Sequence, residues 1–302
     1  MSIWQTKQWW EMLKISNQAS EVFNVRWYYI EKRKVSLWEY WLFILWVEKP
    51  LSEKNIKELI KLCKKEKCLF IQFETINYEK KWFLPFINNE NKFIKGYYKK
   101  FITPYTAIID LSQSEDKILA RMKPKGRYNI KLAWKKRVNV IDVEKKDKNI
   151  EQFYNLLKQT TSRDKFSWNS IEYYKTFLCK IANSKLLLAY VDDVVVAGWI
   201  FTFEEWGVSI YYYWASTSDK NYRNLMAPYL LQWEAIKIAK SMSSIIYDFL
   251  WVASPNEIDS PLSWVTDFKK KLTNNIIEVS DSYIWINKKI KYSIITFLKR
   301  FK

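Results

Sequence analysis

The chain has 302 residues, an apolar fraction of 49% and a formal net charge of +18, from 50 Lys and Arg against 32 Asp and Glu. This size and composition suit a folded protein of one or two domains and exclude a disordered basic tail. The sequence contains no histidine, which excludes Ser–His and Cys–His nucleophilic pairs and histidine-based metal sites.

The first part of the chain alternates β-like and helical segments. A helix is predicted within residues 4–14. Two β-like stretches follow at 25–30 and 40–47, with a basic turn at 31–34 between them. Ser52 is a suitable N-cap for a helix that runs to Cys63 with apolar residues on one face, and a strand follows at 69–74. This alternation predicts an α/β architecture.

A strand at 102–111 leads into a strongly basic stretch. Helices are predicted from Ser114 to Met122 and, beyond Pro124, to Lys136. Between residues 117 and 137 lie nine basic residues and no acidic one. Such a surface suits a nucleic-acid phosphate backbone, and a solvated helix face explains it equally well.

The next segment repeats the order of helices followed by strands. After a strand at 140–143 and a linker at 145–149, we expect two helices, at 150–160 and 170–182. Two strands follow, at 186–191 and 194–203, joined by a turn at Asp192-Asp193.

Residues 209–255 are predicted as strand, turn, helix and strand. Ile210–Tyr213 forms the first strand, and Asn224 is the expected N-cap of a helix with Pro228 in its first turn. The second strand covers 245–250. Such a unit predicts a crossover between parallel strands, and ligands of open α/β sheets bind at the carboxyl ends of strands. On this pattern alone, an ordinary packed unit without a site is the simpler interpretation.

The C-terminal tail is predicted to form a basic amphipathic helix. Its apolar residues share one helical face: Ile290, Ile294, Phe297, Leu298 and Phe301. Such a helix can lie on a membrane, but we favour packing against its own domain. No apolar signal segment opens the chain, and its longest apolar run, at 40–47, is too short to span a bilayer. Three scattered cysteines suit a reducing compartment. We expect a cytoplasmic monomer, with contact to the inner face of the membrane as a further expectation.

Two long stretches of the chain carry recognisable motifs. The first begins with Asp110-Leu111 and continues through residues 114–116 and 121–133. The second comprises 212–216, 223–236 and 247–255. Both resemble the Fem family (FemABX type), the peptidyl transferases that build peptidoglycan interpeptide bridges. Residues 9–14 resemble the opening element of the family, and 266–271 resemble its closing Phe-Lys element. The resemblance covers nearly the whole chain, which looks like the short form without a helical arm.

The resemblance implies an α/β (α+β) chain of two GNAT-like domains, which have an acetyltransferase-like fold, packed across a cleft. We place the first domain at 1–145 and the second at 146–281, and we expect the tail 282–302 to pack back on the first domain. The implied reaction moves an aminoacyl group from aminoacyl-tRNA to the stem-peptide amine of a peptidoglycan precursor that carries UDP or a lipid. We expect no cofactor and no metal, and the glycine-rich pyrophosphate loop of a coenzyme A binder is missing.

The resemblance also implies roles for particular residues. Lys269 matches the lysine of the closing motif and is the candidate cation for the developing oxyanion. Asp110 is the candidate for orienting or deprotonating the incoming amine. The remaining candidates would bind substrate: Lys32, Arg33, Arg127, Tyr128, Tyr211, Arg223, Tyr229 and Phe268.

Two other classes of function stay open at this point. The basic composition also fits a non-catalytic protein that binds nucleic acid or a membrane surface. The fold implied by the resemblance also fits a GNAT-type transferase that uses another acyl donor. Dependence on aminoacyl-tRNA separates the three.

Tryptophan and glycine occur in unusual numbers. The chain has 17 Trp and 4 Gly, whereas average usage predicts about 21 glycines at this length. The family pattern commonly has glycine at five positions that carry tryptophan here: Trp10, Trp46, Trp214, Trp251 and Trp264. We hypothesise that many of these tryptophans are UGA codons of a genome that reads UGA as glycine. A lineage with an aromatic-rich cleft is the alternative.

Overall fold

The structure, a computed structural model, describes residues 3–36, 38–47, 51–78, 93–257 and 259–299. The chain divides into two compact units. Unit 1 comprises 1–104 together with 278–302, and unit 2 comprises 105–277. Each unit is described by itself.

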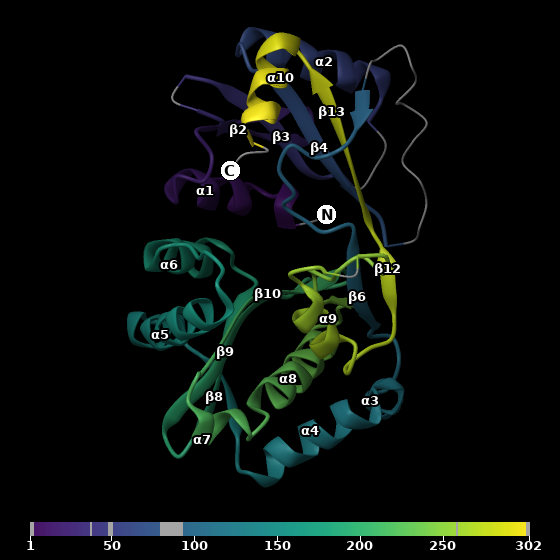
Figure 1. Cartoon of the computed structure of the whole chain (residues 1–302). Helices are drawn as coiled ribbons and strands as arrows, with labels where there is room; N and C mark the ends of the chain where they lie inside the picture. The colour runs from purple at the N-terminus through teal and green to yellow at the C-terminus, as the bar shows by residue number, and fades with distance from the viewer. Residues whose placement is uncertain (1–2, 37, 48–50, 79–92, 258, 300–302) are drawn as a thin grey trace. The chain divides into compact units, whose positions relative to one another are not determined.

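Unit 1 is built on a six-stranded sheet in the order β1-β2-β3-β4-β13-β5 (Figure 1). The strands are β1 (Glu21–Val25), β2 (Tyr28–Lys34), β3 (Tyr40–Val47), β4 (Phe70–Ile76), β5 (Phe93–Lys95) and β13 (Ser280–Ile286). β3 and β4 run parallel and are connected through helix α2 (Glu53–Lys65), whereas the other neighbours are antiparallel. The unit also contains η1 (Ile3–Gln5), α1 (Lys7–Ile15) and α10 (Lys289–Leu298).

Helix α2 forms where the sequence predicts it. The Ser52 hydroxyl accepts a hydrogen bond from the Asn55 amide at 3.2 Å, which caps the first turn. Ile56, Leu59 and Cys63 are buried and belong to one core cluster with residues of β3 and β4. The helical spacing of these apolar side chains thus seats α2 on the sheet.

The predicted basic turn at 31–34 is wrong, because these residues lie inside strand β2. Glu31 is only 3% exposed, and its carboxylate forms an ion pair with Arg33 at 2.6 Å. The turn lies earlier, at Arg26-Trp27, where Arg26 has a φ of 60°. Charged residues in sequence suggest a solvent-exposed turn, but here the charges of Glu31 and Arg33 form a pair and can be accommodated inside a strand.

Unit 2 is built on a seven-stranded sheet in the order β12-β6-β11-β10-β9-β8-β7. The strands are β6 (Tyr105–Asp110), β7 (Asn139–Val143), β8 (Ser184–Val191), β9 (Val194–Thr202), β10 (Val208–Ser216), β11 (Ile246–Asp248) and β12 (Ile276–Glu278). The helices are α3 (Glu115–Arg121), α4 (Pro124–Lys135), α5 (Asp147–Asp164), α6 (Ile171–Lys180), α7 (Lys220–Arg223), α8 (Ala227–Ser241) and α9 (Ser263–Lys269).

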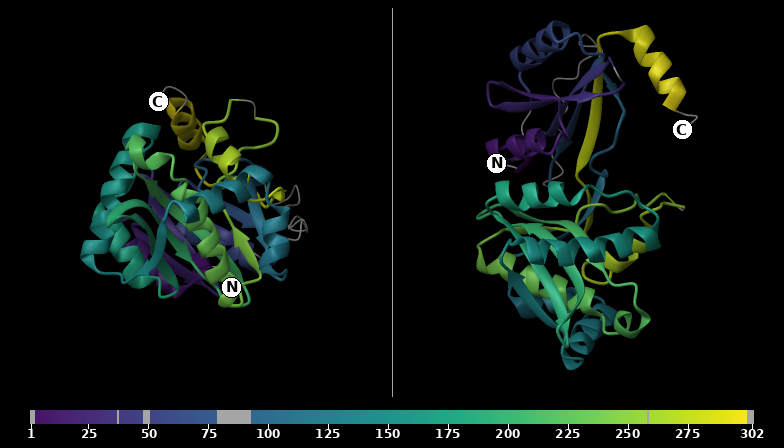
Figure 2. Two further views of the ribbon diagram at one scale, coloured as in Figure 1. Left: turned by 90° about the horizontal axis from the view of Figure 1, so that it is seen from below. Right: turned by 90° about the vertical axis from the view of Figure 1, so that its left-hand side faces the viewer.

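Helices cover both faces of this sheet (Figures 1 and 2). On one face, α4 and α8 share a core cluster with inward side chains such as Leu187, Trp199 and Tyr211. On the other face, Phe153 of α5 approaches Gly198 of β9 so closely that a Cβ there would lie 3.2 Å from its ring. Alternate residues of β8, β9 and β10 therefore face different helices.

The predicted domain boundary near residue 145 differs from the division that the structure gives. Residues 105–145 contribute β6 and β7 to the sheet of unit 2. β6 pairs with β11 in the antiparallel sense, and β7 pairs with β8. These pairings join residues far apart in sequence, so the domain boundary that they define cannot be predicted from local changes in composition. The tail from 278 on belongs to unit 1.

The strand–helix–strand prediction for 209–255 is confirmed, because β10 and β11 pair in parallel and α8 lies between them in the chain. The helix does not begin at Asn224, which instead is the C-cap of α7. The N-cap of α8 is Met226, with a φ of 58° and no side-chain capping bond. Pro228 lies in the first turn of α8, as predicted.

Helix α10 corrects another expectation. The predicted apolar face is not turned into the core of unit 1: no described residue of α10 is buried, and Ile290 is 79% exposed. Phe301 lies outside the described residues. Across the part of the chain that the structure describes, no helix combines the length and apolar character needed to cross a bilayer.

Candidate active site in unit 2

A pocket opens where strands β10 and β11 part. Their parallel pairing covers only Val208–Ile210 and Ile246–Asp248, and β10 carries a bulge between Tyr211 and Tyr213. Beyond Asp248 the chain follows β6, because the Phe249 amide donates to the Ala107 carbonyl at 2.9 Å. A divergence at the carboxyl ends of two parallel strands is where α/β sheets bind ligands.

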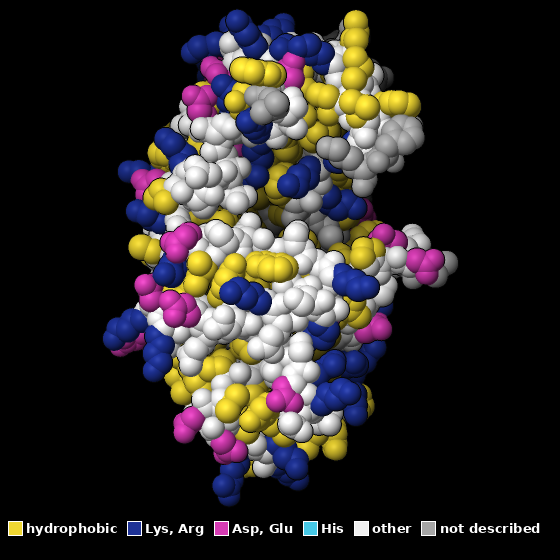
Figure 3. Space-filling view, turned by 60° about the vertical axis from the view of Figure 1, so that its left-hand side comes forward, with side chains coloured by type: hydrophobic (Ala, Val, Ile, Leu, Met, Phe, Trp, Pro, Cys, Tyr) yellow, Lys and Arg dark blue, Asp and Glu magenta, His cyan; other side chains and the backbone are white. Residues whose placement is uncertain are grey.

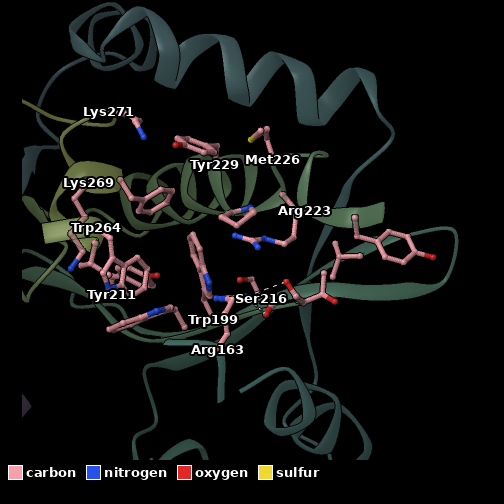
Figure 4. Close-up of a pocket in the computed structure, with 18 residues that line it drawn as sticks. Arg163, Trp199, Tyr211, Ser216, Arg223, Met226, Tyr229, Trp264, Lys269 and Lys271 are labelled. Carbon is pink, nitrogen blue, oxygen red and sulfur yellow. Dashed lines mark hydrogen bonds between the residues drawn. The ribbon is translucent and has the colours of Figure 1, made fainter. Parts of the chain in front are cut away.

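The pocket has a volume of about 380 Å³ and is formed by β9, β10, α8, α9 and the segment around α7 (Figure 4). Lys269, Tyr211 and Trp264 lie toward one end, and Arg163 and Arg223 lie toward the other. The walls also include Trp199, Trp214, Ser216, Met226, Tyr229, Phe268 and Lys271. None of the described residues that line it is acidic. The pocket is therefore aromatic along its walls and positively charged.

Lys269, at the end of α9, is the most unusual group in this pocket. Its side chain is 1% exposed, and Nζ donates hydrogen bonds to the carbonyl oxygens of Leu250 at 2.6 Å and Trp251 at 3.1 Å. Nζ also lies 5.7 Å from the ring centroid of Tyr211 and 5.8 Å from that of Trp214. Burial lowers the pKa of Lys269 to about 7, and the negative charge of Asp248 opposes that shift.

Asp248 supports the loop that holds Lys269. It is fully buried at the end of β11, and its carboxylate accepts hydrogen bonds from the Thr106 hydroxyl and, at 2.6 Å, from the Leu250 amide. Leu250 and Trp251 have left-handed φ angles of 49° and 44°, and this turn points both carbonyls at Nζ. Sequence reasoning missed Asp248, although a carboxylate inside an apolar strand was a usable signal.

The far end of the pocket carries two guanidinium groups. Arg163 of α5 donates to the carbonyl oxygens of Ser216 at 3.4 Å and Thr217 at 3.3 Å, and it forms an ion pair with Asp164 at 2.8 Å. Arg223, at the end of α7, is exposed. Sequence reasoning named Arg223 and missed Arg163, because α5 reaches β10 only through the tertiary fold.

Five of the ten predicted site residues meet in this pocket: Lys269, Tyr211, Arg223, Tyr229 and Phe268. Tyr229 and Phe268 stack edge to face, with ring centroids 4.9 Å apart. Tyr211 is 3% exposed, and burial raises the pKa of its hydroxyl. These three rings therefore form apolar walls, in line with the packing role that aromatic residues usually have.

Asp110 lies elsewhere in unit 2, in a separate cavity with Gln113, Arg121 and residues 272–275. Its carboxylate accepts hydrogen bonds from the Ser112 amide at 3.0 Å and the Gln113 side chain at 3.1 Å. Hydrogen bonding from Ser112 lowers the pKa of Asp110. A lowered pKa makes a carboxylate a weaker base, so this geometry gives the predicted proton-accepting role no support.

Two further predicted residues lie on α4. Arg127 donates to the carbonyl oxygens of Met122 and, at 3.2 Å, Ala120, which are at the C-terminal end of α3. Tyr128 is 57% exposed, and Lys125 Nζ lies 5.1 Å from its ring centroid. The first is thus used in capping a helix, and the second is part of an exposed basic surface.

Lys32 and Arg33 belong to strand β2 of unit 1. Lys32 forms ion pairs with Glu21 at 2.8 Å and Glu66 at 2.9 Å. Burial opposes its charge, but the hydrogen bonds with these two carboxylates outweigh burial and raise the pKa of Lys32. Arg33 pairs with Glu31 and lies 4.4 Å from the Phe101 ring centroid. Both cations already have carboxylate partners within unit 1.

Three of the tryptophans at family glycine positions lie at this site. Trp214 and Trp264 line the pocket, and Trp251 supplies a carbonyl to Lys269. The indole nitrogen of Trp214 is buried without a hydrogen-bond partner among the described residues. Of the other two positions, Trp10 lies in α1, and the side chain of Trp46 lies outside the described residues.

Fold and pocket together place the chain among α/β proteins that have a cleft where two parallel strands diverge. The FemAB family profile matches residues 91–194 and 184–300, so the chain belongs to the FemAB family. The two units have the GNAT-like α/β fold, which confirms the predicted fold class. Family membership supports, in general terms, an acyltransferase that forms peptidoglycan bridges.

Comparison with solved structures gives the same fold. The crystal structure of FemX matches with a TM-score of 0.79 and 16% identity, covering 98% of this chain and 94% of that one. The C-terminal domain of a protein assigned as a lysylphosphatidylglycerol synthetase from Agrobacterium fabrum matches with a TM-score of 0.60 and 10% identity, over 92% and 88%. L-PGS from Bacillus licheniformis matches with a TM-score of 0.52 and 12% identity, over 89% and 85%. Comparison with curated protein sequences gives no significant match.

Proposed function

We propose that this protein transfers an aminoacyl group from aminoacyl-tRNA to the stem-peptide amine of a peptidoglycan precursor that carries UDP or a lipid. The observation that carries the proposal is Lys269, a buried lysine held by two carbonyls in a pocket without an acidic lining residue. Family membership supplies the class of reaction. Net charge is weaker support, because Lys and Arg are interspersed with Asp and Glu on the face shown in Figure 3.

The two ends of the pocket suit two different parts of an aminoacyl-tRNA donor. An aminoacyl-tRNA offers a base and an anionic backbone next to the ester, and aromatic side chains bind bases by stacking while guanidinium groups bind phosphate. Trp199 and Tyr229 provide aromatic walls, and Arg163 and Arg223 provide the cations. In this proposal the ester therefore lies at the end near Lys269.

The chemistry needs little beyond position and charge. The acceptor amine attacks the ester carbonyl carbon, a C–N bond forms, and the carbonyl oxygen becomes an oxyanion. When this intermediate collapses, the bond to the tRNA ribose oxygen breaks and that oxygen takes the proton lost by the amine. An ammonium group has three N–H donors. Two of those of Lys269 are used by Leu250 and Trp251, and the third is the donor we assign to the oxyanion.

The test is a transfer assay with separate donor and acceptor arms. The protein is incubated with a mixture of charged tRNAs and a UDP-linked muropeptide, and the muropeptide is examined by mass spectrometry for the gain of one aminoacyl residue. Acetyl-coenzyme A replaces the tRNA in a second arm. Phosphatidylglycerol replaces the muropeptide in a third arm, because two fold neighbours are named as lysylphosphatidylglycerol synthetases or L-PGS.

Each arm gives a decisive result. Mass gain on the muropeptide that depends on charged tRNA supports the proposal. Acetylation of the muropeptide would show that the donor is acetyl-coenzyme A instead of aminoacyl-tRNA. Aminoacylation of phosphatidylglycerol alone would show that the acceptor is a lipid instead of the muropeptide. Binding of tRNA with no transfer to either acceptor would favour the non-catalytic alternative.

A further inference from the structure

Helix α10 presents its apolar residues to the outside of unit 1. Ile290 is 79% exposed, Ile294 52% and Leu298 57%, and Phe297 between them is 57% exposed. Residues four positions apart lie on one face of a helix, so these side chains form a continuous stripe, here called the α10 stripe. A surface helix of a globular protein usually turns such a stripe toward its core. Here the orientation is reversed.

The opposite face of α10 attaches the helix to its unit. The Tyr292 ring packs edge to face on Phe70 of β4, with ring centroids 5.1 Å apart. Lys299 donates to the Tyr98 carbonyl, and its Nζ lies 4.4 Å from the Tyr98 ring centroid. In Figure 2 the helix extends from the end of β13 along the side of its unit. The exposure of the stripe therefore comes from how the helix is anchored, and the helix is not detached.

Positive charge accompanies the stripe. Residues 288–302 include six Lys and Arg and no Asp or Glu. Among the described residues, the carboxylate that forms ion pairs with this segment is that of Glu39, which contacts Lys288 at 3.8 Å and also pairs with Lys291. Lys289 is exposed. The segment therefore keeps an excess of positive charge beside an exposed apolar surface.

We propose that α10 docks unit 1 on an anionic lipid bilayer. The α10 stripe would enter the boundary between headgroups and acyl chains, and the flanking lysines would contact anionic headgroups. A bilayer fits better than a protein partner, because the cores of protein–protein interfaces are depleted of lysine, whereas lysines bracket this stripe. The inference goes beyond the transfer reaction and does not depend on it.

The experiment uses the full chain and lipid vesicles without tRNA or precursor. Co-sedimentation is measured with vesicles of phosphatidylcholine alone and with vesicles that also contain phosphatidylglycerol. We expect binding to the anionic vesicles that weakens as salt is raised. Ile290→Asn with Ile294→Asn should weaken this binding on the order of tenfold or more. Lys289→Glu should weaken it as well.

The matched control is Ile15→Asn with Ile94→Asn, which changes two isoleucines of the same unit that are 55% and 46% exposed. This control should bind the anionic vesicles as the unmodified chain does. Three results would overturn the proposal: no binding to anionic vesicles, equal binding to both vesicle types, or unchanged binding by the Ile290/Ile294 variant. A change from dimer to monomer in that variant, measured by light scattering, would assign the stripe to a second copy of the chain instead.

Discussion

Lys269 Nζ donates a hydrogen bond of 2.6 Å to the carbonyl oxygen of Leu250, a residue with a left-handed φ of 49°. The lysine lies on α9 and the carbonyl lies on the loop that follows β11, so the bond ties together two segments that meet only in the folded chain. Asp248 holds the same loop from its other side through the Leu250 amide. The buried amine of Lys269 is thus fixed in position at the pocket by two backbone carbonyls.

Burial of Lys269 predicts a dependence of stability on pH. Its pKa is about 7 in the folded chain against 10.5 ordinarily. Between these two values the unfolded chain binds a proton that the folded chain lacks, so the free energy of unfolding rises with pH across that window. Between about pH 7 and pH 9, the free energy of unfolding of the unmodified chain should rise by roughly 2–3 kcal/mol relative to that of Lys269→Met. Urea unfolding at a series of pH values measures this, and parallel curves for the two proteins would contradict the lowered pKa.

The same titration should appear in the transfer rate. If the charged form of Lys269 stabilises the oxyanion, the single-turnover rate should fall as pH rises through about 7. Asp248→Asn removes the charge that favours the ammonium, so this falling limb should move to lower pH. Asp142→Asn changes an aspartate that pairs with Lys185 on β7 and β8, and it should leave the limb in place. If the falling limb of the pH–rate profile lies at the same pH in Asp248→Asn as in the unmodified chain, the charge of Asp248 does not set the pKa of Lys269.

The basic stretch from 117 to 137 is predicted to contribute to polyanion binding. In the structure Lys125, Lys131, Lys135 and Lys136 are exposed on or next to α4. Lys135→Glu with Lys136→Glu should weaken tRNA binding and flatten its dependence on salt, because fewer counterions are released. Filter binding at several salt concentrations gives the slope of affinity against salt. A slope equal to that of the unmodified chain would show that this helix face is only solvated.

The tryptophan hypothesis predicts the codons of the gene. The Trp251 backbone adopts a φ of 44°, where glycine is free of the strain that a side chain meets. Trp214 places a buried indole N–H without a described partner in the pocket wall. We expect UGA codons at 214 and 251, and we expect the protein with glycine at both positions to bind substrate more tightly than the printed sequence. UGG at these two positions would end the hypothesis.

Local rules in the sequence predicted much of the fold. Ser52 and the apolar spacing behind it located α2, and Pro228 located the first turn of α8. The parallel pair β10–β11 followed from the length of the connection. The errors arose where tertiary pairing overrides local chemistry. Residues 31–34 form a strand because they pair with β1 and β3, and the ion pair between Glu31 and Arg33 compensates their charge there.

The site was predicted only in part for a similar reason. The resemblance located both Lys269 and Arg223, because each lies within one of its continuous motifs. Arg163 contacts Ser216 and Asp248 contacts Thr106, both far away in sequence, and such contacts cannot be predicted from the spacing of residue types along the chain. Asp110 stands at a strand end as expected, but it lines a different cavity from Lys269.

Single-turnover transfer by Lys269→Ala tests whether Lys269 stabilises the oxyanion of aminoacyl transfer. Loss of one oxyanion donor typically costs on the order of 10²–10³ in rate, so we expect a loss of this size with tRNA affinity within a few-fold of the unmodified chain. The control is Lys270→Ala, a neighbouring lysine that does not line the pocket, and it should transfer normally. A Lys269→Ala protein that transfers at the rate of the unmodified chain would contradict the claim.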